Sequence, residues 1–312
     1  MFFNIVDSDE INGRAWCNDK EDHVEINKGV IRTSYDLFSE INKYYKNEFL
    51  KKFLKNESEE TIEQMSFEAI VFDNGVPKMT DSKKIVDDRT NLLGIFAWRF
   101  ILLHEFGHIF NGHCSYLTDR EKKNAIIPMY YTDNMHRQNI SALDIRTMEM
   151  DADMFAVTQS IWHLLFLYRD FDSQVRCEGL KPMDLFYWWA FAIRSHFLLC
   201  GDRLVDTNRY SEDMKHLPSN ARWGMIVNTA VEIIENKINP TVLNISEACG
   251  KFFRGAKEAE VIFNELKFTS YSFYDELCEN EQYKHYCNQV NTNWKKIVKE
   301  LKAYSRCQLY EG

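Results

Sequence analysis

The sequence predicts an α+β fold that is mostly α-helical and carries a small N-terminal β-sheet. Three short runs with strand character lie in the first thirty residues, whereas almost every apolar segment after residue 90 repeats with helical periodicity. Only 12 Gly and 5 Pro punctuate the 312 residues, which is typical of long helices. We expect one domain, with a sheet and helix part over residues 1–90, a helical core over 91–237 and a helical extension over 238–312.

The N-terminal elements are predicted from their local periodicity. Short strands are predicted over 2–6, 14–17 and 23–26, and in the last of these Val24 and Ile26 alternate with polar neighbours. From Thr33 onwards the pattern changes to that of an amphipathic helix. One further strand is predicted over 67–72, and a polar loop is expected to follow it through Thr90.

The rest of the chain is predicted to be helical. The expected helices span 91–117, 141–169, 182–202, 219–237, 245–266 and 271–305. The stretches 92–103 and 185–200 are the most apolar, but both are shorter than the roughly 20 residues of a membrane span and each contains an Arg. We therefore expect buried core helices and no transmembrane segment, although the pair Trp188 and Trp189 could instead contact a membrane or a partner.

Composition and charge limit the classes of function. Hydrophobic residues make up 45% of the chain and charged residues 27%, which describes a folded protein and excludes global disorder. A net charge of −9 argues against a nucleic-acid partner, because phosphate binding requires a basic surface. The eight cysteines include no Cys-x-x-Cys pair, and no basic region precedes the first apolar run. We therefore expect a cytoplasmic protein with reduced thiols.

The segment around residue 104 contains the clearest chemical motif, His104-Glu105-x-x-His108. In a helix, residues four apart lie on one face, so both imidazoles can reach one metal ion. Glu105 is offset around the helix and can point at a water bound to that ion. Such a site uses zinc to make the water more acidic, and the glutamate accepts its proton during attack on a peptide carbonyl. The motif predicts a zinc-dependent peptidase.

A catalytic zinc ion requires a third protein ligand. The pattern with a third histidine six residues after the second fails, because Asn111 and Cys114 occupy the positions that would have to be Gly and His. His113 is therefore interpreted as a residue at the helix end or the rim of the site, with a ligand role as the alternative.

Glu149 is the predicted third ligand, and Asp151 is the alternative. Glu149 opens another apolar helix and shares one face with Asp153, while small alanines on that side allow close packing against the histidine helix. Asp153 is then expected to accept a hydrogen bond from the outer nitrogen of His104 and to fix its tautomer. The simpler interpretation is a solvated acidic cluster at a helix start.

The combination of His-Glu-x-x-His with a later Glu-x-x-Ala-Asp resembles the gluzincin metallopeptidases. Within them the chain is most similar to the bacterial phage-exclusion peptidases typified by Lit, and next to the ImmA/IrrE group. The similarity spans about residues 20–230, and it rests on the apolar run into His104, on His113, on residues 149–156 and on the segment from His216 to Arg222. Two positions differ from the family pattern, since Leu217 separates His216 from Pro218 and Asp151 stands where Glu is common.

The resemblance implies a zincin-like helical core and an intracellular endopeptidase that acts on a protein partner such as a translation factor, in phage defence or stress regulation. Such a peptidase also needs a donor or cation for the developing oxyanion. We favour His216 with Arg222 for this role, although Arg222 could equally be a solvated residue of a helix start. The candidates on the polar stretch 118–139, which is either substrate-facing or a plain connector, are Tyr130, Tyr131 and His136.

Two other functions remain open. In the first, zinc holds the helices of a sensor or binding protein together and no turnover occurs. In the second, an ImmA/IrrE-like regulator cuts or sequesters a repressor. An endopeptidase of this kind could also stay silent until an activating protein or peptide exposes or supplies its substrate.

Overall fold

The computed structural model describes ten parts of the chain, namely residues 1–18, 21–54, 70–73, 76–79, 88–121, 126–128, 140–175, 179–200, 219–265 and 281–309. They form a mostly helical α+β structure with an N-terminal sheet. The expected fold class is confirmed at this level.

The N-terminal strands lie where the sequence predicts them. They are β1 (Phe2–Val6), β2 (Gly13–Cys17) and β3 (Asp22–Asn27). The sheet has the order β1-β3-β2-β6, in which β1 runs parallel to β3, and β2 runs antiparallel to both neighbours. The fourth strand, β6 (Ile126–Pro128), comes from the polar stretch after the histidine motif, which was not expected to contain a strand.

A separate hairpin and nine described helices complete the fold. The hairpin consists of β4 (Ile70–Asp73) and β5 (Val76–Met79), and β4 overlaps the strand expected over 67–72. The helices are α1 (Lys28–Leu54), α2 (Asp88–Phe110), α3 (His113–Glu121), α4 (Ala142–Arg169), α5 (Phe171–Gln174), α6 (Asp184–Cys200), α7 (Ser219–Asn236), α8 (Ile245–Glu265) and α10 (Glu281–Leu301). Residues 271–280 of the predicted 271–305 helix lie outside the described residues.

The prediction of one continuous helix over 91–117 is wrong. Helix α2 ends at Phe110, and α3 begins three residues later at His113. Gly112 adopts a φ of 84° between them, a conformation that glycine adopts without steric cost. A Cβ at Gly112 would also lie 2.6 Å from the carbonyl carbon of Tyr304, so the C-terminal segment packs directly against this turn.

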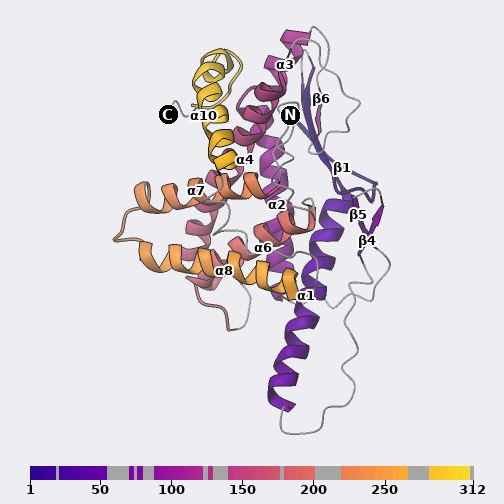
Figure 1. Ribbon diagram of the computed structural model, residues 1–312, viewed down its shortest axis with the longest axis vertical. Coiled ribbons are helices and arrows are strands. Elements are labelled where there is room, and N and C mark those ends of the chain that lie inside the picture. Colours follow the sequence, from indigo (N-terminus) through magenta and orange to yellow (C-terminus); the bar gives the residue numbers. More distant parts are fainter. Residues whose placement is uncertain are drawn as a thin grey trace.

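Helix α2 occupies the centre of the molecule, between the N-terminal sheet with α1 on one side and α6, α7 and α8 on the other (Figure 1). It contacts α1, α4, α6 and β2. By length and composition it could cross a membrane, but 61% of its apolar window is buried inside the molecule, and a core helix passes the same test. Large apolar residues such as Phe96 and Phe100 place it in the main hydrophobic core.

The second apolar segment, now α6, is also part of the core. Trp189 is 1% exposed and lies edge-on to Phe100, while Trp188 is partly buried with the guanidinium of Arg89 over its ring. Trp189 therefore does not present a surface to a membrane or a partner in this structure.

Candidate metal centre

The site is formed where α2 crosses α4, and a glycine allows the two helices to approach closely. A Cβ added at Gly107 would lie 3.0 Å from Cα of Ala152 and 3.2 Å from Cβ of Phe155. At this separation a carboxylate on α4 reaches the imidazoles on α2. The small residues expected on this face of α4 therefore serve the close packing that the sequence suggested.

Three ligand atoms converge at this crossing. The Nε2 atoms of His104 and His108 are 3.2 Å apart, Oε2 of Glu149 is 3.3 Å from the first, and Oε1 of Glu149 is 3.4 Å from the second. A tetrahedral ion with bonds of about 2.0 to 2.1 Å has ligand–ligand edges of about 3.3 to 3.4 Å, so each imidazole lies near this distance from the other imidazole and from one oxygen of Glu149. This buried group could hold a metal ion.

Behind His104 lies a carboxylate held by a guanidinium. Nδ1 of His104 is 2.8 Å from Oδ1 of Asp153, as the spacing on α4 predicts. Arg222 on α7 donates from Nε and from an Nη atom to the two oxygens of Asp153, both at 2.8 Å. Burial by itself raises the pKa of Asp153, but Arg222 outweighs it and holds this pKa below its usual value. Asp153 is therefore an ionised acceptor for the N–H of His104.

Behind His108 lies a different set of partners. Nδ1 of His108 is 3.0 Å from Nδ1 of His113, whose Nε2 is 3.0 Å from Oδ2 of Asp151. The side-chain amide of Asn111 donates to the same Asp151 oxygen at 2.5 Å. Asp151, the alternative ligand, thus lies outside the converging group.

His113 is a buried neighbour of the site, with no exposed surface, and not a residue of its rim. The sequence predicts His108 and His113 on one continuous helix, in which residues five apart point in different directions. The contact between their side chains was therefore not predicted. The signal that could have revealed it is the Asn111-Gly112 pair, because this dipeptide is typical of a turn that reverses the chain.

Glu105 is buried beside the converging atoms. Its residue exposure is 0%, and neither carboxylate oxygen has a hydrogen-bond partner among the described residues. Burial raises the pKa of Glu105 to about 8, against the attraction of a charged His104. Strand β2 passes directly over it, since a Cβ at Gly13 would lie 2.9 Å from Oε1 of Glu105.

The two histidines differ in their preference for a proton when no cation is present. Burial lowers the pKa of His104, but its contacts with Asp153 and Glu149 outweigh burial and raise it to about 10. Burial lowers the pKa of His108 well below its usual value. The carboxylates of Asp153 and Glu149 thus favour the charged form of His104, and a metal ion at its Nε2 must compete with a proton there.

The structure does not test the predicted oxyanion pair, because His216 lies outside the described residues, as do Tyr130, Tyr131 and His136. Arg222 is only 5% exposed, so the interpretation as a solvated residue of a helix start is wrong. Its guanidinium faces Asp153, which places it behind the metal ligands.

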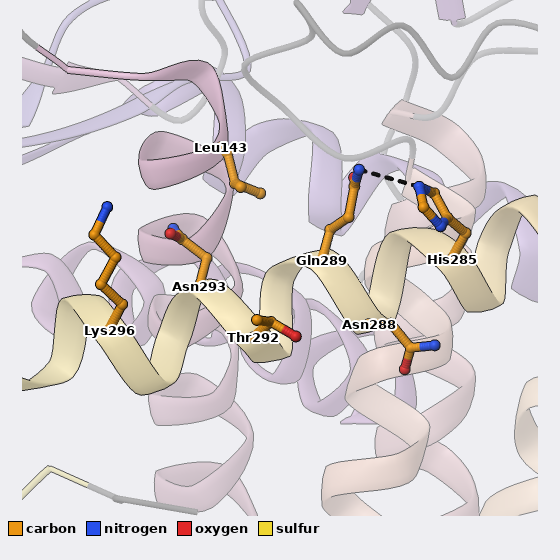
Figure 2. Close-up of a pocket in the computed structure, with 7 residues that line it drawn as sticks. All are labelled: Leu143, His285, Asn288, Gln289, Thr292, Asn293 and Lys296. Atoms are coloured by element: carbon orange, nitrogen blue, oxygen red, sulfur yellow. Dashed lines mark hydrogen bonds between the residues drawn. The ribbon is translucent and has the colours of Figure 1, made fainter.

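An open hollow lies on α10, away from the metal group. Its lining comprises Leu143, His285, Asn288, Gln289, Thr292, Asn293 and Lys296 (Figure 2). Asn293 is used structurally, because its amide donates to Asp144 and Thr147 of α4 at 2.9 Å each. The lining contains none of the ligand or carboxylate groups of the metal centre.

Comparisons of this chain with protein families, with curated proteins and with solved structures find no match. The function must therefore be inferred from the residues and their geometry.

Proposed function

We propose that this protein is a zinc-dependent peptidase of the gluzincin type, with a zincin-like core in which His104, His108 and Glu149 are the zinc ligands. The observation that carries the proposal is the pair of Nε2 atoms 3.2 Å apart, each 3.3 to 3.4 Å from one carboxylate oxygen of Glu149, next to the buried Glu105, which has no hydrogen-bond partner among the described residues. Two imidazoles and one carboxylate are a ligand set of catalytic zinc sites, which keep the fourth position for water or substrate.

A bound zinc ion would supply a Lewis acid that polarises the scissile carbonyl and makes a water molecule acidic near neutral pH. Glu105 accepts the proton of that water at its carboxylate and can later deliver it to the leaving amine. Glu105 must be ionised to accept this proton, and the positive charge of a bound zinc ion would favour that form against the burial that raises the pKa of Glu105. Asp153 and Arg222 keep His104 oriented during these steps.

Access to the site supports the further proposal of an activation step. His104, Glu105, His108 and Glu149 are each at most 1% exposed, so a peptide bond can reach them only after a covering segment moves. Strand β2 is one such segment, because Gly13 contacts Glu105. We infer that an activating protein or peptide, or the substrate itself, displaces this cover. The resemblance to phage-exclusion peptidases favours a cytoplasmic protein substrate.

The same burial favours one other function, a sensor or binding protein in which zinc only stabilises the crossing of α2 and α4. Structural zinc sites are closed to solvent, whereas catalytic sites keep an open coordination position. Three protein ligands and an adjacent glutamate favour the peptidase, while complete burial favours the sensor.

Substitution of the proposed base separates the two functions. Wild type and Glu105→Gln are expressed in a bacterial host, with and without phage infection, and newly formed protein N-termini are compared across the proteome. The peptidase predicts cleaved proteins in the wild type only, with zinc content equal in both purified proteins. An identical pattern of N-termini in both strains would instead support the sensor.

A further inference from the structure

We propose that His113 and Asp151 are positioning residues that hold His108 in the tautomer and orientation required for metal binding. This inference rests on the proposed zinc site. The geometry is a chain of three contacts at 3.0, 3.0 and 2.5 Å that runs from His108 through His113 to Asp151 and Asn111. His113 and Asp151 are 0% and 8% exposed, so water does not easily replace these contacts.

The direction of each hydrogen bond follows from the role of His108. A neutral histidine that binds metal through Nε2 must carry its proton on Nδ1, so His108 donates to Nδ1 of His113. His113 must then carry its own proton on Nε2, and this N–H donates to Asp151. A single arrangement of protons therefore satisfies both imidazoles and places the lone pair of His108 toward His104 and Glu149.

The acceptor behind His108 differs from the one behind His104. His104 donates directly to a carboxylate, whereas His108 donates to an imidazole that a carboxylate orients. This series of contacts continues to the C-terminal segment. The thiol of Cys307 lies 3.1 Å from the amide oxygen of Asn111, and the backbone N–H of Arg306 donates to the backbone carbonyl of Phe110 at 2.8 Å. These contacts fix the turn that brings His113 against His108.

Two substitutions of His113 test this role. In His113→Phe the aromatic shape remains but the N–H of His108 loses its acceptor, whereas in His113→Gln the amide oxygen can accept from His108 and the amide nitrogen can donate to Asp151. Leu117→Val is the matched control, because Leu117 is fully buried on the same helix as His113 and its side chain has no group that could accept a hydrogen bond from His108.

The measurement is the zinc dissociation constant of each purified full-length protein, by competition with a chromophoric chelator, together with the visible absorption of the cobalt(II) form. We expect His113→Phe to weaken zinc binding about 10 to 100-fold and to shift the cobalt bands, and His113→Gln to restore most of the affinity. Asp151→Asn should give a smaller loss, and it provides a second test if His113→Phe does not fold.

The inference is overturned if His113→Phe and Asp151→Asn bind zinc within about twofold of the wild type, or if Leu117→Val weakens binding to the same extent. Failure of the proposed peptidase looks different. In that case the wild type binds zinc, and substitutions of His113 and Asp151 weaken the binding, but no protein cleavage depends on Glu105. A wild type that binds no zinc would overturn both.

Discussion

Arg222 is the residue whose observed place most changes its expected role. From the sequence it was a candidate for binding the oxyanion, but in the structure it donates two hydrogen bonds to Asp153. Arg222→Met would leave the buried Asp153 without its cation, and burial would then raise the pKa of Asp153. We expect about 10 to 100-fold weaker zinc binding, measured by chelator competition.

Arg222→Lys is the corresponding control, because it keeps the charge but cannot form the two-pronged contact with the carboxylate. It should recover part of the affinity. If Arg222 instead stabilised the transition state, its substitution would leave zinc affinity unchanged and lower the kcat measured with a substrate. That result would contradict the positioning role and support the expectation from the sequence.

His196 on α6 should make the stability of the fold depend on pH. Burial first, and the charge of Arg222 second, lower its pKa from 6.5 to about 4. Between these two pH values the unfolded chain binds a proton that the folded protein does not, so stability is lost as pH falls from about 6.5 to 4. We expect the free energy of unfolding to fall by about 2 to 3 kcal/mol less in His196→Gln than in the wild type over this pH range.

The comparison uses urea unfolding of both proteins in their metal-free forms, so that loss of zinc at low pH does not contribute. The difference between the two proteins isolates His196 from the carboxylates and from the other histidines. Parallel loss of stability in the wild type and in His196→Gln would show that His196 is not held neutral by burial.

At the scale of secondary-structure elements, the separation of α2 and α4 decides whether the ligand atoms meet. Gly107 contacts the backbone of Ala152, so a larger side chain must push the helices apart. We expect Gly107→Val to lower the free energy of unfolding by about 1 to 3 kcal/mol and to weaken zinc binding in the same protein. Both quantities are measured by urea unfolding and chelator competition.

Gly250→Ala on α8 is the matched control for backbone effects. A Cβ there would meet nothing within 4 Å, so only the higher helix propensity of alanine acts. We expect this substitution to stabilise the protein by up to about 1 kcal/mol and to leave zinc binding unchanged. If Gly107→Val were as harmless as Gly250→Ala, the close packing of α2 and α4 would not be what sets the ligand separation.

The elements also show which parts of the fold and of the site could be predicted from sequence. His104 and His108 were predictable because their relation is local, four residues along one helix, and Glu149 with Asp153 repeats that spacing on α4. The contact of His108 with His113 was not predictable in this way. It depends on a turn at Gly112 that packs against the C-terminal segment, nearly two hundred residues later in the chain.

The same reasoning applies to the sheet. The first three strands follow from local sequence within four or five residues each, and the structure has them with nearly the same bounds. Strand β6 is three residues long and pairs with β2 across more than a hundred residues of chain. A segment this short has too little periodicity to identify, so its strand conformation is set by the partner strand.

At the scale of the whole molecule, the metal group connects elements from distant parts of the sequence. The proposed ligands come from α2 and α4, Arg222 adds α7 through Asp153, and Asn293 ties α10 to the start of α4. A ligand that binds only the folded protein stabilises it in proportion to the logarithm of the ligand concentration over Kd. Zinc should therefore stabilise the whole assembly of these helices and not only α2.

We predict that zinc at about 100 times its Kd stabilises the folded protein by about 2.7 kcal/mol. For a chain of this size the midpoint of thermal unfolding should then rise by about 4 °C, which is measured by calorimetry with zinc added or with a chelator. His104→Ala should show no zinc-dependent shift, whereas Glu105→Gln should respond like the wild type because Glu105 is not a ligand. Equal shifts in the wild type and in His104→Ala would mean that zinc stabilises the protein from another place.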